Sequence, residues 1–438
     1  MLEEMNAYTM AEKIHRSNGR LKRTDSKSAR RREPVSSVQK DTRLSTKPNL
    51  IPRCMNVVGL FAGIGGIELG LEAAGHRTTL ACEIDAAARA VLQARFPRLA
   101  LHDDIRTLDR LPKGTDLVTG GFPCQDISQA GKTNGISGKN SGLVNEVFRL
   151  LEKSDVPFVL LENVSFILAL NRGHAMRHVT SELERLGYKW AYRVLDSQAF
   201  GLPQRRQRMF LLASRVGEPF EFLMTGNEEP IEPKDWRGRA CGFYWTEGVR
   251  GLGWAVDGVP TLKNGSTVGI ASPPAIWMPD GRIVTPDIRD AERMQGFEAG
   301  WTAPALAVSR QGFRWKLVGN AVSVPAAKWI GARLKQGPVT VDMRVHTFDQ
   351  STKWPVAAFG GPGRRALAVD ISMWPVAMPR VPLTKFLQYE PKLLSHKATA
   401  GFVSRLRSGS LHFPQEFLSA LDRHAERMRT QLPLFAVA

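Results

Sequence analysis

The sequence predicts an α/β protein built on a doubly wound, mostly parallel sheet, with a second, smaller and irregular β-type domain. From Val57 onward, short apolar runs alternate with stretches of helical periodicity, which is typical of buried parallel strands and their crossover helices. From about 216 to 283 the chain is instead rich in Gly, Pro, Trp and turn residues. Helical patterning returns at Arg289–Met294 and Ala326–Leu334, so we expect the large domain to be completed late in the chain.

The expected elements of the large domain follow one another along the chain. Its strands are the apolar runs Val57–Phe61, Leu117–Thr119, Phe158–Leu161 and Met209–Ala213. Its first helices are Ile67–Ala74, Ala86–Phe96 and Leu143–Leu151. The first of these ends before Gly75 and the second before Pro97, and both residues are helix stop signals. In the third, the apolar residues at 143, 147, 150 and 151 share one face, which predicts packing on the sheet.

These patterns divide the chain into five segments. Residues 1–55 have few large apolar residues and no sustained periodicity, so we expect a mostly disordered basic arm. The α/β domain occupies 56–214, the small domain 215–288, and the segment that completes the α/β domain 289–337. Residues 338–438 form a basic extension with apolar stretches, to which the sequence assigns no role.

The net charge indicates a polyanionic partner. The 438 residues carry a formal charge of +18, which favours nucleic acid. The excess lies mainly in the flanks: residues 1–56 hold 13 Lys and Arg against 6 Asp and Glu, and residues 338–438 hold 13 against 7. Basic tails that merely aid solubility are the alternative explanation.

Cysteine spacing and hydropathy exclude several classes of protein. The four cysteines are far apart and form no C-x-x-C pair, which argues against a disulfide framework or a zinc site, so we expect no metal. No apolar run reaches the roughly 18 residues that a membrane span needs. A soluble intracellular protein is the simplest interpretation.

A glycine-rich turn after the first strand predicts a cofactor pocket. Phe61-Ala62-Gly63-Ile64-Gly65-Gly66 opens a helix, where glycines let a ligand approach the backbone. Glu68 stands where the dinucleotide fingerprint has its third glycine, so a cofactor without a pyrophosphate fits better. Glu83 and Ile84 follow the run Thr79–Cys82, and Glu83 is placed to accept hydrogen bonds from ribose hydroxyls. Asp104-Ile105 could hold an adenine edge; a purely structural turn is the alternative.

One thiol is a candidate nucleophile. In Gly120-Gly121-Phe122-Pro123-Cys124-Gln125, Cys124 follows a proline at the end of an apolar run, where an α/β enzyme places a nucleophile. A helix N-terminus or a nearby cation would help this thiol to ionise, and the turn after Pro123 offers such a site. A buried core thiol is the alternative.

Six blocks in a fixed order resemble the C5-cytosine DNA methyltransferases, which use S-adenosylmethionine. They are Phe61–Gly66, Gly121–Gln125, Glu162-Asn163-Val164, Gln204–Arg208, Arg289–Phe297 and Gly319–Val322. The resemblance covers Val57 to about Leu334 and implies a class I methyltransferase fold with a Rossmann-like sheet. It also implies that 56–214 bind the cofactor and carry catalysis, and that 215–288 recognise the target. Glu298 replaces the proline that the family often has after Gly-Phe.

The resemblance assigns a catalytic role to four residues. A thiolate must add to C6 of cytosine before C5 can accept a methyl group, and Cys124 matches the family's nucleophile. Glu162 would bind N3 and the exocyclic amine, while protonated or sharing a proton, at the carboxyl end of a buried strand. Arg208 would contact O2 of the base, and Arg206 would help to position the carboxylate, the thiol or a phosphate. Solvated surface arginines and a helix-capping glutamate are the alternatives.

The family's cofactor site implies further residues late in the chain. Asn320, Ala321 and Val322 resemble the block that returns to the S-adenosylmethionine pocket. Pro123 and Leu143 would flank the cofactor, although helix packing alone explains Leu143 equally well.

The implied substrate is a cytosine in a short sequence of double-stranded DNA, flipped out of the stack. Within the recognition segment, Thr261 belongs to a Thr-Leu doublet that resembles the family's. Together with Arg237, Arg239, Lys263 and Asn264 it is a candidate to contact bases or phosphates. In the extension, Tyr389 and several basic residues are candidates for further DNA contacts, and a role in packing or in a dimer is the alternative.

The resemblance further implies a monomeric enzyme in the cytoplasm of a prokaryotic cell, partnered in restriction-modification by a cognate endonuclease. Two alternatives stay open. One is a tRNA cytosine-5 methyltransferase, because a tRNA-directed branch of the family keeps the DNA-type blocks. The other is a DNA-binding protein that has lost catalysis, against which the intact Cys, Glu and Arg set counts.

Overall fold

The structure is a computed structural model that describes residues 54–123, 142–233, 235–263 and 271–430. The predicted N-terminal arm lies almost entirely outside these residues, as do Cys124 and Asn264. Within the described part of the chain, no helix is both long enough and apolar enough to cross a membrane.

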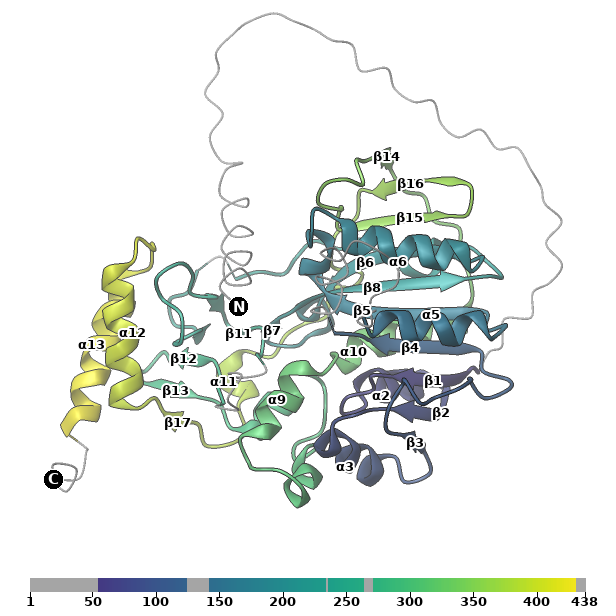
Figure 1. Ribbon diagram of the computed structural model, residues 1–438. Helices are drawn as coiled ribbons and strands as arrows, with labels where there is room; N and C mark the ends of the chain where they lie inside the picture. Colours follow the sequence, from purple (N-terminus) through teal and green to yellow (C-terminus); the bar gives the residue numbers. More distant parts are fainter. Residues whose placement is uncertain (1–53, 124–141, 234, 264–270, 431–438) are drawn as a thin grey trace, which may run out of the picture. The chain divides into compact units, whose positions relative to one another are not determined.

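The large sheet has ten strands in the order β14-β16-β15-β6-β8-β5-β4-β1-β2-β3 (Figure 1). Its parallel half consists of β1 (Asn56–Leu60), β2 (Arg77–Cys82), β3 (Ala100–His102), β4 (Leu117–Gly121) and β5 (Phe158–Val164). The central strands are runs of buried apolar residues because helices cover both faces of the sheet. The α/β fold predicted from the sequence is confirmed.

The other half of the large sheet is antiparallel. β8 (Gln207–Ser214) pairs antiparallel with both β5 and β6 (Lys189–Asp196). The run Met209–Ala213 is therefore a strand, as predicted, but the prediction that it is parallel is wrong. β8 is buried on both faces, as the strands of the parallel half are, so its composition does not indicate its direction. The sheet as a whole is mixed.

Helices cover the two faces of this sheet. Val58 and Val118 pack with α5 (Val144–Glu152) and α6 (His174–Arg185), which lie side by side (Figure 1). On the opposite face, α2 (Gly66–Ala73) packs against α10 (Val324–Gln336), and α3 (Ala86–Arg95) packs on the 3₁₀ turn Ala303–Ala307. Each helix of the sequence prediction is present, with ends that shift by one or two residues. The late helix α10 thus joins the first helix of the domain.

A second sheet has five short strands in the order β10-β9-β12-β13-β17. They are β9 (Cys241–Phe243), β10 (Ala255–Val256), β12 (Ala275–Trp277), β13 (Ile283–Thr285) and β17 (Lys392–Leu393). Beside it, β7 (Gln204–Arg205) and β11 (Val259–Pro260) form a two-stranded parallel pair. One core of the small sheet includes residues of α8 (Ile288–Arg293) and Val318 of α9 (Phe313–Asn320). The shorter helical segments are Ser165–Leu168, Ser197–Phe200, α7 (Phe220–Leu223) and α11 (Leu383–Phe386).

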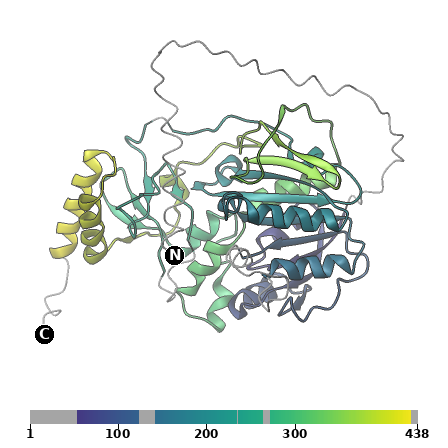
Figure 2. The ribbon, with the colours of Figure 1, turned by 45° about the horizontal axis from the view of Figure 1, so that its top comes forward.

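The C-terminal extension is built into both sheets. β14 (Val345–Thr347), β15 (Ala357–Gly361) and β16 (Arg364–Val369) continue the large sheet beyond β6. β17 adds the last strand of the small sheet by pairing with β13. The helices α12 (His396–Ser408) and α13 (Gln415–Thr430) lie side by side in both views (Figures 1 and 2), and their Phe402 and Phe417 pack on Phe243 of β9.

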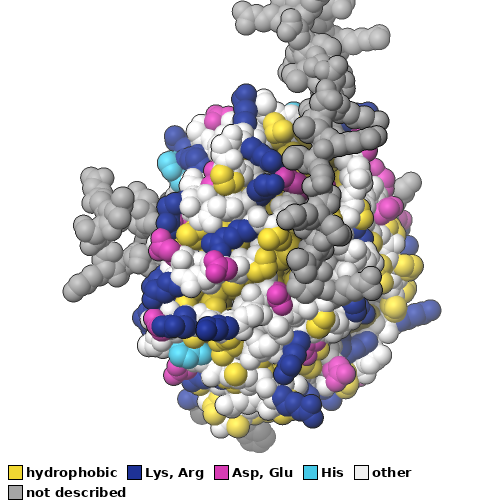
Figure 3. Space-filling model, turned by 90° about the vertical axis from the view of Figure 1, so that its right-hand side faces the viewer, with side chains coloured by type: hydrophobic (Ala, Val, Ile, Leu, Met, Phe, Trp, Pro, Cys, Tyr) yellow, Lys and Arg dark blue, Asp and Glu magenta, His cyan; other side chains and the backbone are white. Residues whose placement is uncertain are grey.

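The positive charge of the chain is dispersed on at least one face. In Figure 3, Lys and Arg side chains are spread between acidic and apolar ones and do not gather into one patch. Several of the described basic residues are paired with neighbouring carboxylates, as in Arg185 with Glu152 and Arg364 with Glu218. The net charge alone therefore does not locate a binding surface.

Candidate active site

The predicted site residues follow strands that end at one edge of the large sheet. Phe61 follows β1, Glu83 follows β2, Pro123 comes two residues after β4, and Glu162 lies near the end of β5. Because these strands are parallel, their carboxyl ends meet at the same edge, where ligands bind in open α/β sheets. Arg208 reaches this edge from the beginning of the antiparallel strand β8.

The glycine-rich turn has the backbone conformation that its glycines predict. Gly63 and Gly65 have φ of 57° and 85°, and Phe61 also has a positive φ of 55°. A Cβ at Gly65 would lie 2.5 Å from the Phe96 ring, and one at Gly66 would lie 2.5 Å from the Val322 carbonyl oxygen. The turn therefore packs closely, through Gly66, against the block that contains Asn320, Ala321 and Val322.

Glu83 fixes the turn from the end of the second strand. Its Oε2 accepts a hydrogen bond from the Gly63 amide at 2.7 Å, and its Oε1 accepts one from the Asp85 amide at 2.7 Å. Burial raises the pKa of this carboxyl, and the two amide bonds act in the opposite direction. Each oxygen keeps a second lone pair that can accept a further hydrogen bond.

The predicted cofactor residues differ in which of their atoms a ligand can reach. The side chains of Ile64, Ile105, Ala321 and Val322 are buried. Ile84, in contrast, is 63% exposed beside Glu83, which is unusual for a large apolar side chain. Asn320 and Pro123 are exposed, and Leu143 packs partly buried at the start of α5. The Asp104 carboxylate binds Arg106 through both oxygens, and these bonds lower its pKa.

Glu162 and Arg208 form a nearly buried ion pair. The Arg208 Nε lies 3.1 Å from Glu162 Oε1, and both side chains are 10% exposed. Burial raises the pKa of the Glu162 carboxyl, while the charges of Arg208 and Arg206 lower it. A Cβ at Gly121, which pairs with Glu162 across the sheet, would lie 3.3 Å from Glu162 Oε2. Gly121 thus leaves room for the carboxylate.

Asn163 holds the segment that leads to the candidate nucleophile. Its Nδ2 donates a hydrogen bond to the Phe122 carbonyl at 2.9 Å. Sequence reasoning assigned no role to this residue, although it is part of the Glu162-Asn163-Val164 block. Cys124 itself lies outside the described residues. Cys82 and Cys241 are poor nucleophiles, because burial raises the pKa of each thiol to about 12.

Arg206 lies inside the protein and contacts backbone carbonyls. Its side chain is buried, its Nη1 donates to the Leu262 carbonyl at 3.3 Å, and its Nη2 donates to Gly319 and Ala321 at 3.1 and 2.6 Å. The guanidinium therefore joins the Gln204–Arg208 block to the Thr-Leu doublet and to the block around Asn320. These contacts suit a positioning residue.

The candidate DNA contacts divide into engaged and exposed groups. The Thr261 hydroxyl donates to the Arg205 carbonyl at 2.8 Å, and Lys263 binds Glu247 and lies 3.7 Å from the Tyr244 ring centroid. Arg237 is exposed, stacks on Trp236 and binds Asp235 at the surface. Arg239 forms a longer ion pair of 3.4 Å with Asp257. Arg237 and Arg239 are the more accessible candidates.

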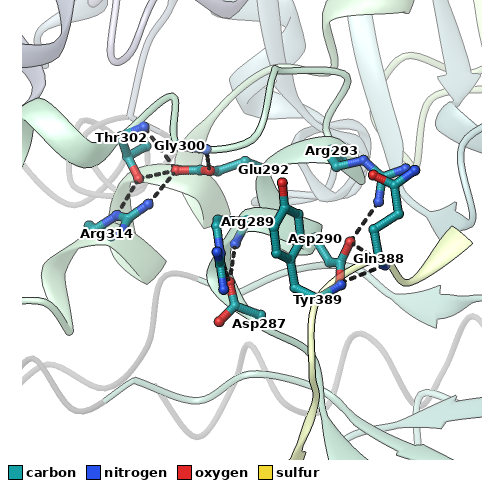
Figure 4. A network of polar contacts seen from close by, with 10 residues as sticks. All are labelled: Asp287, Arg289, Asp290, Glu292, Arg293, Gly300, Thr302, Arg314, Gln388 and Tyr389. Carbon is teal, nitrogen blue, oxygen red and sulfur yellow. Dashed lines mark hydrogen bonds and ion pairs between the residues drawn. The ribbon is translucent and has the colours of Figure 1, made fainter.

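The helix α8 supports the site through two buried carboxylates (Figure 4). Asp290 accepts hydrogen bonds from Arg293 and from the Gln388 and Tyr389 amides of the extension. The other carboxylate, Glu292, accepts bonds from the backbone amides of residues 300 and 302 and from the guanidinium of residue 314, all of them in the late segment. These contacts give the block that contains α8 a structural role, and its partners include the extension.

No group of three His, Cys, Asp or Glu side chains that could hold a metal ion occurs in the described part of the chain.

Comparisons with known proteins agree with these observations. The family model of the C-5 cytosine-specific DNA methylase matches residues 55–240. The type II methyltransferase M2.BsuMI of Bacillus subtilis (strain 168) is 46% identical over 390 residues, which are 85% of this chain and 99% of the relative. M.NlaX of Neisseria lactamica is 30% identical over 64% of this chain and 96% of its own length. M.BsuFI of Bacillus subtilis is 28% identical over 66% of this chain and 75% of its own length.

The coverage of these relatives differs at the extension. The match to M2.BsuMI covers 85% of this chain. The residues that it leaves out are fewer than the residues of 338–438, so the match must include part of the extension. The other two matches cover about two thirds of this chain.

Proposed function

This chain belongs to the C-5 cytosine-specific DNA methylase family, and we propose that it methylates C5 of a cytosine flipped out of duplex DNA, through a covalent bond between Cys124 and C6. The methyl donor in this proposal is S-adenosylmethionine. As a member of the family the chain is a DNA cytosine-5 methyltransferase. The flipped base, the covalent adduct and the roles of single residues are the proposed part.

The observation that carries the proposal is the buried pair of Glu162 and Arg208. An acid whose pKa is raised by burial and an arginine beside it suit a base that gains negative charge toward N3 and O2. The pair lies next to Gly121 at the end of β4, three residues before Cys124. In this proposal the attacking thiol is that of Cys124, which comes two residues after Phe122 in the sequence.

The chain's own groups suffice for the first step. The Cys124 thiolate forms a bond to C6, and the electrons of the C5–C6 double bond move toward C5 and the N3–O2 side of the ring. Glu162 gives or shares a proton at N3, and Arg208 neutralises the charge at O2. After C5 has taken the methyl group and S-adenosylhomocysteine has left, water or another base accepts the C5 proton, the C5–C6 double bond is restored, and the thiolate leaves C6. S-adenosylmethionine supplies the methyl as an electrophile.

Several residues fit S-adenosylmethionine. The open turn at Gly63 allows a ligand near the backbone, and the spare lone pairs of Glu83 can accept from ribose hydroxyls. The exposed Ile84 offers an apolar face for the adenine, and Asn320 is an exposed polar group near Val322. Asp104 could serve the adenine edge only if its pairing with Arg106 leaves an acceptor free.

The substrate in this proposal is a short duplex sequence bound by a monomer. Arg237 and Arg239 are the accessible candidates for contacts to phosphates or base edges. The relatives are named type II methyltransferases, which supports a modification role beside a cognate endonuclease.

Covalent trapping tests the mechanism. Duplex DNA containing 5-fluorocytosine and S-adenosylmethionine should yield a denaturation-resistant adduct, because fluorine at C5 blocks the release of the thiolate. Cys124→Ala should give no adduct, whereas Cys54→Ala, which changes an exposed cysteine, should trap normally. Bisulfite sequencing of DNA from expressing cells should then identify the site. Absence of methylation, or labelled methyl groups only in RNA, would contradict the proposal.

A further inference from the structure

Two buried glutamines connect three segments that are distant in the sequence. The Leu262 amide donates to Gln204 Oε1 at 2.9 Å. Gln204 Nε2 donates to the Met294 carbonyl at 2.9 Å and to Gln295 Oε1 at 3.2 Å, and Gln295 Nε2 donates to the Val318 carbonyl at 2.8 Å. Both glutamines are 0% exposed. We call these two side chains the amide relay.

The direction of the amide relay is fixed by its ends. A side-chain amide has donors on nitrogen and acceptors on oxygen, so each glutamine fits its partners in one orientation. At one end the relay meets a backbone N–H, and at the other a backbone C=O. Turning either amide would place like groups together and leave buried donors and acceptors without partners, which is unfavourable in the protein interior.

Further buried contacts strengthen the same junction. The Ser323 hydroxyl donates to Gln295 Oε1 at 3.1 Å and shares a 2.6 Å hydrogen bond with Ser197. Arg206 runs parallel to the relay, because it also joins Leu262 to the carbonyls of Gly319 and Ala321. The junction is thus held by two routes between the same pair of segments.

The two ends of the amide relay belong to different parts of the proposed site. Leu262 is in the Thr-Leu doublet of the proposed recognition segment. Val318 lies in α9, directly before the block whose Asn320 and Val322 are proposed to meet the cofactor. Between them, Gln204 begins the short strand four residues before Arg208. The doublet and the cofactor block are therefore connected by hydrogen bonds between buried groups.

We propose that Gln204 and Gln295 are positioning residues that couple duplex binding at the recognition segment to S-adenosylmethionine binding. The inference rests on the proposed function. Neither side chain needs to touch a substrate. Coupling of this kind is reciprocal, so DNA tightens cofactor binding by the same factor as the cofactor tightens DNA binding.

The test measures S-adenosylhomocysteine affinity by calorimetry, with and without a short duplex that carries the site found by bisulfite sequencing. For the unaltered chain we expect affinity at least roughly fivefold higher with the duplex, the lower end of typical couplings. Gln204→Leu should reduce this factor to less than about twofold. The change acts on the affinity for the cofactor even though Gln204 is bonded to Leu262 of the recognition segment. Gln295→Leu should do the same, and the double variant should be no worse than either single one.

Two further variants separate coupling from stability. Tyr188→Phe removes a buried hydrogen bond to the Val156 carbonyl outside the junction, so it should lower the melting temperature and leave the coupling factor unchanged. Gln204→Glu keeps the acceptor for the Leu262 amide but can donate only when protonated. Its coupling factor should therefore rise as the pH is lowered. This variant also serves if the leucine variants fail to fold.

The outcomes are distinguishable from a failure of the proposed function. If the unaltered chain methylates no DNA, the proposed function fails. If it methylates DNA but the duplex does not change S-adenosylhomocysteine affinity, the coupling is wrong. The coupling is equally wrong if the Gln204 and Gln295 variants keep the full factor, or if Tyr188→Phe loses it to the same extent.

Discussion

The guanidinium of Arg208 lies 3.1 Å from the carboxylate of Glu162, with both side chains 10% exposed. The two residues come from neighbouring antiparallel strands, and Arg208 is paired with Val164, two residues after Glu162. The register of the two paired strands therefore sets the distance between these side chains, and neither residue lies on a loop. A charge pair held in this way needs little rearrangement when charge develops on a bound base.

Removing either member of this pair should abolish most of the methylation. We expect Glu162→Gln and Arg208→Lys each to lower the single-turnover rate by roughly 10²–10³-fold, because each loses a group that meets developing charge. Burial raises the pKa of Glu162, so a step that needs its proton should slow as the pH rises through that pKa. Rates within threefold of the unaltered chain for both variants would contradict the assignment.

Glu68 should make stability depend on pH. It is buried, its Oε2 has no hydrogen-bond partner among the described residues, and burial raises its pKa to about 8. Between pH 4.5 and about 8 the folded chain then binds a proton that the unfolded chain has lost. The free energy of unfolding should therefore fall as the pH rises from 4.5 to about 8, by roughly 4–5 kcal/mol at most.

Denaturant titrations across this pH range check the expectation. Glu68→Gln should remove most of the slope, since it cannot ionise. Glu426→Gln, at an exposed glutamate, should keep it. An unchanged slope in Glu68→Gln would mean that another group is responsible.

Ile84 should contribute to cofactor affinity and not to stability. Its side chain is 63% exposed, so Ile84→Ser removes little buried surface from the folded chain. If adenine covers this side chain, the variant should weaken S-adenosylhomocysteine binding by about 1–2 kcal/mol, or roughly tenfold. Val216→Ser, which changes another exposed apolar residue, serves as the control in the same calorimetry and should bind normally.

Asp290 should anchor the extension. Asp290→Ala leaves Arg293 and the amides of Gln388 and Tyr389 without their buried acceptor, which should cost about 3–5 kcal/mol in urea unfolding. Asp287→Ala is a matched change on the same helix, but it removes a surface cap and should cost about 1 kcal/mol. Equal losses in the two variants would show that the buried bonds add nothing special.

Phe417 should stabilise the small sheet from the extension. Its ring is 0% exposed and lies 4.9 Å from the ring centroid of Phe243 in β9. Phe417→Ala should therefore destabilise the protein by about 3–5 kcal/mol. Leu393→Ala, at a 39% exposed residue of the same extension, should cost far less. Thermal unfolding that does not distinguish the two would contradict this packing role.

The parallel half of the large sheet could be predicted because its strands are runs of buried apolar residues separated by helices. The direction of β8 could not, since a strand buried on both faces looks the same in either direction. β17 has two exposed residues, Lys392 and Leu393, and exists only because β13 offers an edge to pair with. Such a strand leaves no local pattern.

The candidate site shows the same division. Glu162 and Arg208 stand in motifs whose residue types announce their chemistry. Gln204 and Gln295 also stand in such blocks, but their residue type does not reveal their role, because it depends on hydrogen bonds with the backbone of Leu262 and Val318. Polar residues of this kind become visible only when their partners are known.

Under the proposal that 215–288 recognise the target, the participation of the extension in both sheets limits how this enzyme can change its specificity by recombination. A recognition domain encoded by one continuous stretch can be exchanged between relatives as a cassette. Here the core around Phe243 also requires Phe402 and Phe417, which are encoded more than a hundred residues later. A graft of 215–288 alone would carry only part of this hydrophobic core into its new host. New specificities in this lineage should therefore arise by paired exchanges or by point changes on the loops.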